Sequence, residues 1–201
     1  AWQRRPGGGD GLAERAARAH GAPAALPVPG SQAAINTLPA LRPPGRVAVP
    51  AAEYGEHAPA WARWGHAVER IDPATVAAGP PARPGWEVLV LSHPNNPTGR
   101  RYPKAVLRAW HQALAARGGW LVLDEAFADA APERSLAGEC GPPGLLVLRS
   151  LGKFYGLAGA RVGFLLGDAD ARRRLAELLG PWPLAGPARE AACRALADTA
   201  W

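Results

Sequence analysis

Methionine is absent from this 201-residue sequence, cysteine occurs twice, and lysine supplies only two of the 23 basic residues. Without a methionine the chain lacks its own initiator, so we expect it to be a fragment of a longer protein. Cys140 and Cys193 lack the spacing of metal ligands, which predicts no metal site and favours reduced thiols in a cytoplasmic protein. No run of about 18 apolar residues is present, so no transmembrane helix is predicted. The first residues show no signal-peptide pattern.

The scarcity of lysine draws attention to Lys104 and Lys153. Arginine stays protonated at working pH, whereas a lysine can lose its proton when its surroundings lower its pKa. A lysine kept in an arginine-rich chain therefore hints at amine chemistry, such as a Schiff base with a carbonyl group. The alternative is that two surface lysines occur by chance, and only the neighbours of each lysine can separate these interpretations.

The net charge of +6 and the pI near 10.1 are compatible with a nucleic-acid partner. The basic residues are scattered, however, and the densest group is only Arg172, Arg173 and Arg174. This distribution favours solvated helix faces and predicts no nucleic-acid partner. A positive field also suits a small phosphorylated substrate.

Apolar runs that alternate with helical stretches predict an α/β fold, with a mostly parallel sheet covered on both faces in a three-layer α/β/α sandwich. We predict strands at 46–49, 86–91, 119–124, 145–148 and 161–166. We predict helices at 11–20, 56–71, 103–117, 168–179 and 186–200. In the second of these helices, Trp61, Trp64 and Val68 share one side. Residues 26–32 are predicted as a turn that leads into a helix of about ten residues.

Polar residues follow the predicted strands at the ends where parallel sheets bind ligands. Asn96 comes after the second strand, Asp124 ends the third, and Ser150 and Lys153 follow the fourth. Lys153 supplies an amine, Asp124 a carboxylate that could pair with a protonated pyridine, and Asn96 an amide that could donate to a phenolate oxygen. A single ligand could use all three groups. Phosphate donors would come from Ser150, Arg161 and the turn at Gly30, Ser31 and Gln32. Together these groups match the parts of pyridoxal 5'-phosphate.

Two other readings of the same glycine-rich stretch find less support. Ser150-x-x-Lys153 also occurs in serine hydrolases, but no partner motifs for that chemistry are found. Gly152, Gly156 and Gly159 lack the spacing of a dinucleotide-binding fingerprint. His93 is interpreted as a structural residue.

These motifs resemble those of fold-type I pyridoxal-phosphate enzymes of the class I and II aminotransferase group, over nearly the whole chain. The resemblance implies that Lys153 forms the Schiff base, Asp124 faces the ring nitrogen and Asn96 bonds the ring O3'. It implies that Arg161 binds the phosphate and that Tyr54 stacks on the ring. The remaining implied cofactor-binding residues are Gly30, Ser31, Gln32 and Ser150.

Longer stretches resemble the threonine-phosphate decarboxylases of cobalamin biosynthesis, namely 28–34, 124–129, 148–159, 180–187 and 197–201. This resemblance implies decarboxylation of L-threonine O-3-phosphate to (R)-1-amino-2-propanol O-2-phosphate. Lys153 would be the proton donor to the carbanion. The alternatives are a transaminase like histidinol-phosphate aminotransferase, or a non-catalytic fragment that retains the fold.

The resemblance also implies a domain organisation. Residues 1–183 would form the cofactor-binding large domain, and residues 184–201 would begin the helix that leads to a small C-terminal domain. Relatives are dimers with active sites at the subunit interface, so a homodimer is implied for the full-length protein, with little activity in this piece alone.

One position departs from the family pattern. Relatives often carry a tyrosine three residues after the aspartate, where this chain has Phe127. Because a donor to the phenolate oxygen is lost, we predict a higher pKa for the Schiff base than in a relative with the tyrosine.

Overall fold

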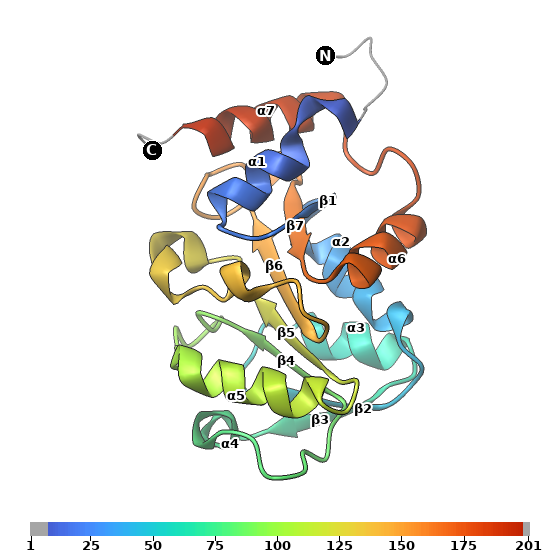
Figure 1. The fold of residues 1–201 in the computed structure, drawn as a ribbon, viewed down its shortest axis with the longest axis vertical. Helices are drawn as coiled ribbons and strands as arrows, with labels where there is room; N and C mark the ends of the chain where they lie inside the picture. Colours follow the sequence, from blue (N-terminus) through green and yellow to red (C-terminus); the bar gives the residue numbers. More distant parts are fainter. Residues whose placement is uncertain (1–7, 199–201) are drawn as a thin grey trace.

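A seven-stranded sheet forms the centre of the computed structural model, which describes residues 8–198 (Figure 1). The strands are β1 (Leu26–Val28), β2 (Arg46–Pro50), β3 (Ala67–Ile71), β4 (Val88–Ser92), β5 (Trp120–Asp124), β6 (Leu145–Ser150) and β7 (Gly163–Leu166). The helices are α1 (Leu12–Ala19), α2 (Gly30–Thr37), α3 (His57–Arg63), α4 (Pro73–Ala78), α5 (Lys104–Ala115), α6 (Ala169–Leu179) and α7 (Gly186–Ala197). Short 3₁₀ helices occur at Gly8–Asp10, Leu38–Leu41, Ala128–Ala130, Pro132–Arg134, Ala137–Glu139 and Ala158–Ala160.

The sheet is mostly parallel, as the sequence predicts. Its order is β1-β7-β6-β5-β4-β2-β3, and the pairs from β6 through to β3 are all parallel. Only β7 and β1, at one edge, run antiparallel to their neighbours. Parallel strands need crossover connections, which are usually helices that cover the sheet, and this explains why helices alternate with strands along the chain.

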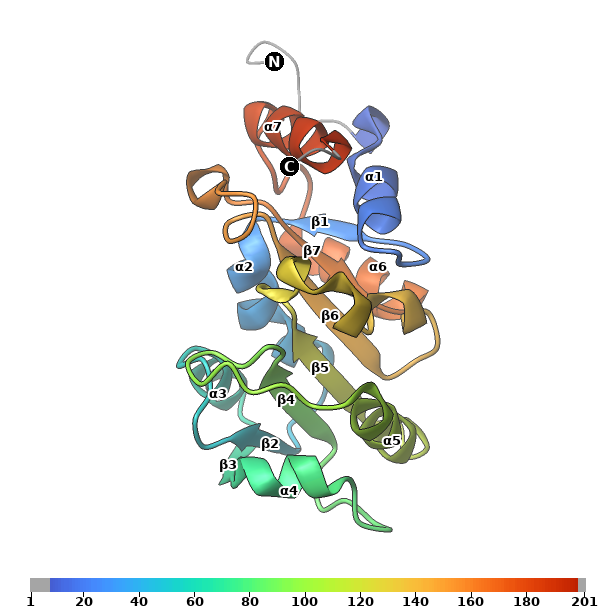
Figure 2. The same cartoon turned by 90° about the vertical axis from the view of Figure 1, so that its left-hand side faces the viewer.

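Two hydrophobic layers cover the sheet, one on each face, and confirm the predicted three-layer sandwich. In β4, Val88 and Val90 belong to the layer that also contains residues of α2, α3 and α6, whereas Leu89 and Leu91 belong to the layer that contains residues of α1, α5 and α7. Successive strand residues point to opposite faces, so a continuous apolar run supplies both layers at once. Figure 2 shows α2 and α3 on one side of the sheet and α5 on the other.

The helix predicted at 56–71 is wrong, because that stretch contains α3 and then strand β3. Gly65 lies just beyond α3 with a φ of +81°, a left-handed conformation that ends helices and suits glycine. Trp61 is buried at 2% exposure and Trp64 is 46% exposed, so the three predicted residues do not share one buried side. The apparent helical spacing of Val68 with the tryptophans is a coincidence across this break.

The turn predicted at 26–32 is also wrong, because residues 26–28 form β1 and helix α2 already begins at Gly30. Pro27 is tolerated there since β1 is an edge strand, where one side of the backbone needs no partner. Helix α4 was not predicted, although Asp72 caps it by accepting a hydrogen bond from the Ala74 N–H at 2.7 Å. The other predicted helices and strands are present, with ends shifted by a few residues. Of the helix predicted at 186–200, residues 199–200 lie outside the described part of the chain.

Helices α1 and α7 lie side by side at one end of the molecule (Figure 1). Arg189 of α7 pairs with Asp10, just before α1, with 2.6 Å between Nη2 and Oδ1. Between residues 8 and 198, no helix has both the length and the apolar character needed to cross a membrane.

Candidate active site

The topology brings the ends of several elements to one edge of the sheet. Ser92 at the end of β4 is paired with Asp124 at the end of β5. Because β7 runs antiparallel to β6, its first residue, Gly163, pairs with Ser150 at the end of β6. Gly163 also pairs with Val28, the last residue of β1, and α2 begins two residues later. The carboxyl ends of β4, β5 and β6 therefore meet the start of α2 and the segment before β7.

A cavity of about 180 Å³ lies at this edge. Its walls contain most of the side chains that the sequence singles out, namely Ser31, Gln32, Tyr54, Asn96, Asp124, Ser150, Lys153 and Arg161. Ser92, Ala126, Phe127, Gly152 and Ala158 complete the lining. Gly30 is the one predicted cofactor-binding residue that does not line the cavity, and it lies against Arg161 instead. Their functional roles remain predictions.

Asp124 contributes a buried carboxylate to the lining of the cavity, with 5% of the residue exposed. Its Oδ1 accepts a hydrogen bond from the Ala126 N–H at 3.1 Å. Its Oδ2 lies 3.2 Å from Nε2 of His57, which is itself buried. The two atoms are within ion-pair distance, but their angles do not form a hydrogen bond, so Nε2 has no such partner among the described residues.

His57 was missed by the sequence prediction. It lies three residues after Tyr54 at the start of α3, and the tyrosine ring meets the histidine ring edge-on at 5.7 Å. Tyr54 lies in the loop before α3, so the pair has no helical spacing that would have marked His57 in the sequence.

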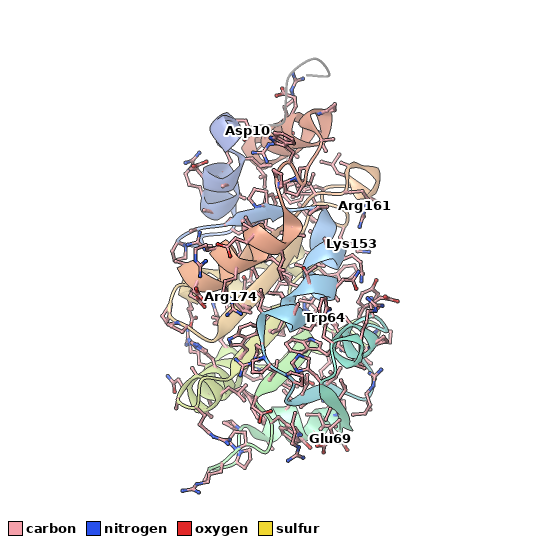
Figure 3. All side chains as sticks on the ribbon, turned by 90° about the vertical axis from the view of Figure 1, so that its right-hand side faces the viewer. Asp10, Trp64, Glu69, Lys153, Arg161 and Arg174 are labelled. Atoms are coloured by element: carbon pink, nitrogen blue, oxygen red, sulfur yellow. The ribbon has the colours of Figure 1, made fainter. Side chains whose placement is uncertain are left out.

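Lys153 lies in the turn after β6, with its Nζ 5.2 Å from the centre of the Phe127 ring. The turn is held by the Gly152 N–H, which donates to the Ser150 hydroxyl at 3.2 Å. Within residues 8–198 no carboxylate lies within ion-pair distance of Lys153 or Arg161. Figure 3 shows both cations on the same side of the molecule, beside α2. Their charges are thus available to an anionic ligand.

Arg161 adopts a left-handed backbone conformation, with φ and ψ both near 52°, which is uncommon outside glycine. Its Nη1 donates to the Ala158 carbonyl at 3.1 Å. Such strained residues tend to lie at functional sites.

The guanidinium of Arg161 lies over Gly30, where a Cβ atom would come within 2.6 Å of Nη2. Gly30 also has a φ of +71°, so two independent features require glycine at the first position of α2. The free N–H groups at that helix end, together with the helix dipole, favour an anion beside Arg161.

Tyr54 closes another wall of the cavity. Its hydroxyl donates to Oε1 of Gln32 at 3.1 Å, which ties the loop after β2 to helix α2. Burial raises the pKa of Tyr54, with smaller contributions in the same direction from Glu56 and Asp124. The phenol therefore remains protonated near neutral pH and can donate. Asn96, which also lines the cavity, is half-buried in the turn after β4. The nearby His93 is buried, with Nε2 3.1 Å from the Tyr102 carbonyl oxygen, as fits a structural residue.

A buried ionic cluster supports this edge from the opposite face of the sheet and was not predicted. Arg149 is 2% exposed and its Nη1 lies 3.0 Å from Oε2 of Glu125, while Nη2 pairs with Asp129. Burial raises the pKa of Glu125 and of Asp129, and the positive charge of Arg149 opposes both shifts. Burial, with a smaller effect of Arg149, lowers the pKa of His20 to about 3.

The cluster and the cavity share adjacent residues of the same strands. Asp124 and Ser150 line the cavity, whereas their chain neighbours Glu125 and Arg149 belong to the cluster. The alternation of side chains along a strand accounts for this division.

No group of three or more His, Cys, Asp or Glu side chains within residues 8–198 is arranged to hold a metal ion.

The chain is similar to known enzymes over most of its length. Residues 7–200 match the family described as aminotransferase class I and II. The threonine-phosphate decarboxylase of Pseudomonas aeruginosa is 51% identical over 198 residues, which cover 98% of this chain and 59% of that protein. A threonine-phosphate decarboxylase from Sinorhizobium sp. is 44% identical over 165 residues, covering 81% of this chain and 48% of that protein. The histidinol-phosphate aminotransferase of Sodalis glossinidius is 36% identical over 115 residues, or 57% of this chain and 32% of that protein.

Solved structures share the fold. L-threonine-O-3-phosphate decarboxylase from Porphyromonas gingivalis superposes with a TM-score of 0.83 at 22% identity, over 99% of this chain and 65% of that one. Histidinol-phosphate aminotransferase from Sinorhizobium meliloti, in complex with pyridoxal-5'-phosphate, gives a TM-score of 0.79 at 22% identity, over 94% of this chain and 55% of that one. The chain thus spans less than two thirds of the length of each of these relatives.

Proposed function

The chain belongs to the class I and II aminotransferase family, and we propose that its cavity binds pyridoxal 5'-phosphate in a threonine-phosphate decarboxylase. The reaction would convert L-threonine O-3-phosphate to (R)-1-amino-2-propanol O-2-phosphate and carbon dioxide. The observation that carries the proposal is a single cavity lined by a lysine amine, a buried carboxylate, an amide and a guanidinium, in a chain 51% identical to a threonine-phosphate decarboxylase.

The residues present fit this cofactor. Asp124 is a buried carboxylate whose nearest basic group is the histidine His57, which favours a cationic ring nitrogen as its partner. The Ser92 hydroxyl is buried beside the cavity without a hydrogen-bond partner in the described structure. The Arg161 guanidinium lies over Gly30, in the space that a Cβ would fill. In the described part of the chain this guanidinium has no acidic partner.

The phosphate would be held at the end of the cavity formed by α2. The N–H groups of Ser31 and Gln32, the Ser150 hydroxyl and the Arg161 guanidinium would donate to its oxygens. At the other end, Asn96 would donate to the ring oxygen, and Tyr54 would pack against the ring face.

When bound, pyridoxal 5'-phosphate supplies an aldehyde that links to an amine and a ring that accepts electrons from a breaking bond at Cα. Lys153 would hold the aldehyde and, once displaced by the substrate amine, would carry the proton delivered to Cα from its Nζ. Asp124 would keep the proton on the ring nitrogen, and His57 would help to orient that carboxylate from behind.

The alternative is an aminotransferase that acts on histidinol phosphate. Both reactions would use the same cavity residues to hold the cofactor. They differ only in which bond at Cα breaks. The two decarboxylases, at 51% and 44% identity, cover more of this chain than the histidinol-phosphate aminotransferases, which are 36–39% identical, and this difference favours decarboxylation. A non-catalytic protein with the same fold is the remaining alternative.

The test is product analysis with the full-length protein loaded with pyridoxal phosphate. We expect carbon dioxide from carboxyl-labelled L-threonine O-3-phosphate, and no release with Lys153→Ala. Amino transfer from histidinol phosphate to 2-oxoglutarate, without release of carbon dioxide, would favour the aminotransferase. Binding of the cofactor with neither reaction would favour the non-catalytic alternative.

The same proposal extends to organisation and partners. Residues 1–183 would form the cofactor-binding domain, and residues 184–201, of which 199–201 lie outside the described part, would lead to a small C-terminal domain. The full-length protein would work as a cytoplasmic homodimer on a small phosphorylated amino acid. Size measurement of the full-length protein by light scattering tests the dimer.

A further inference from the structure

Glu53 places a buried carboxylate between two loops that border the cavity. Only 8% of the residue is exposed, and its oxygens accept three hydrogen bonds. Oε1 accepts from the Tyr54 N–H at 2.8 Å, and Oε2 accepts from the Ser92 N–H at 2.9 Å and from Asn95 Nδ2 at 3.1 Å. Among the described residues, no basic side chain lies within ion-pair distance of it, so three neutral donors satisfy this carboxylate.

The Glu53 carboxylate replaces a hydrogen-bond acceptor that strand β2 does not provide at the end of β4. Strands β2 and β4 pair through only two couples, Val47–Val88 and Ala48–Leu89. At the end of β4, the N–H of Ser92 donates to the side chain of Glu53 instead of to a strand. A buried N–H needs a partner, so Glu53 stabilises the sheet edge where the cavity begins.

A second bond fastens the same two loops. Asn95 Nδ2 also donates to the Ala52 carbonyl at 3.0 Å, and Asn95 Oδ1 accepts from the Thr98 N–H at 3.1 Å. The residues next to this fastening, Tyr54 and Asn96, both line the cavity. Glu53 thus connects the backbone of one cavity residue to the turn that carries the other.

The connection continues around the cavity. Tyr54 donates through its hydroxyl to Gln32 on α2, at the end where Ser31 and Arg161 lie. A hydrogen-bonded path therefore runs from the turn after β4, through Glu53 and Tyr54, to the start of α2.

We propose that Glu53 is a positioning residue for the cofactor: it holds the two loops that carry Tyr54 and Asn96 in a fixed arrangement beside the ring site. This inference rests on the proposed function, since it assumes that the cavity binds pyridoxal phosphate. Glu53 does not line the cavity and acts only through its neighbours.

The variant Glu53→Gln tests the proposal with little change in shape. An amide nitrogen cannot accept, so in either orientation of the side chain at least one of the three donors loses its acceptor. Glu56→Gln is the matched control, because Glu56 lies three residues away and is exposed, and its side chain makes no hydrogen bond in the described structure. Both are compared with wild type as full-length proteins.

The measurements are the dissociation constant of pyridoxal phosphate, the induced circular dichroism per bound cofactor, and the melting temperature without cofactor. At temperatures where Glu53→Gln is still folded, we expect it to bind the cofactor at least about tenfold more weakly than wild type and to lose induced dichroism. Glu56→Gln should match wild type in cofactor affinity and in induced dichroism. A lower melting temperature with unchanged affinity and dichroism would mean a purely structural role and would overturn the inference.

If Glu53→Gln does not fold, Asn95→Ser serves in its place. Serine can still bond locally within the turn but lacks the amide that reaches Glu53 and Ala52. Wild-type affinity and dichroism in Asn95→Ser would then overturn the inference. Failure of wild type itself to bind pyridoxal phosphate would instead refute the proposed function.

Discussion

The substitution Gly30→Ala tests the anion site where the structure is most restrictive. A Cβ at this position would lie 2.6 Å from Nη2 of Arg161 and 3.1 Å from its Cζ. Both contacts are tighter than van der Waals distance, and both involve the far end of a flexible side chain. We therefore expect the guanidinium to move away from the start of α2 and the surrounding fold to remain.

Two magnitudes follow from this geometry. The φ of +71° at Gly30 is strained for alanine, which costs about 1–2 kcal/mol of unfolding free energy. A hydrogen bond to a charged group contributes about 1.5–3 kcal/mol, so displacement of Arg161 should weaken phosphate binding about 10- to 150-fold. The second effect depends on the phosphate and the first does not.

Comparison of pyridoxal phosphate with pyridoxal separates the two effects. In Gly30→Ala, we expect a large rise in the dissociation constant of pyridoxal phosphate and little change for pyridoxal, both followed by cofactor absorbance. Gly159→Ala is the control, since a Cβ there meets nothing within 4 Å and its φ is not positive. An equal loss of affinity for both compounds would refute the placement of the phosphate beside Arg161.

Three further predictions concern the cavity and the buried cluster. Phe127→Tyr restores a donor beside Lys153 and should lower the pKa of the Lys153–cofactor linkage; an unchanged midpoint in a pH titration of visible absorbance would contradict this. His20 has a pKa of about 3 when folded and 6.5 as its ordinary value, so its contribution to stability is complete above pH 6.5 and is lost as pH falls toward 3. Denaturant unfolding should show wild type losing stability relative to His20→Gln by about 1.4 kcal/mol per pH unit within that window, and parallel profiles would disprove it. Arg149→Met leaves the carboxylates of Glu125 and Asp129 buried without their cation and should lower the free energy of unfolding by about 3–5 kcal/mol, whereas a loss below 1 kcal/mol would show that the cluster is not needed.

The fold was predictable where local pattern and tertiary packing agree. Strands such as β4 and β5 are continuous apolar runs that end at a polar residue, and both were predicted with small errors at their ends. The segment 56–71 was mispredicted because tryptophan and valine spacing suggested one helix, while Gly65 divides it. Edge strand β1 was missed because three residues with a central proline carry no strand signal without their partner β7.

The candidate site was predictable to the extent that its chemistry sits on motifs. Lys153, Asp124 and Asn96 are placed by strand ends, which the sequence marks clearly. Glu53 and His57 were missed because their importance comes from neighbours 39 residues or more away in the chain, such as Ser92 and Asp124. Single-sequence periodicity does not report contacts of that range.

The division of adjacent strand residues between two faces makes the ends of β5 and β6 intolerant of changes in length. Deletion of one residue within β5 would turn Glu125 toward the ligand and Asp124 toward the arginine, and deletion within β6 would exchange Ser150 with Arg149. A substitution there alters one side chain, whereas a register shift of one residue exchanges the side chains on the two faces of the strand. We therefore expect natural length variation to collect in exposed connections such as residues 81–83, and to spare these two strands.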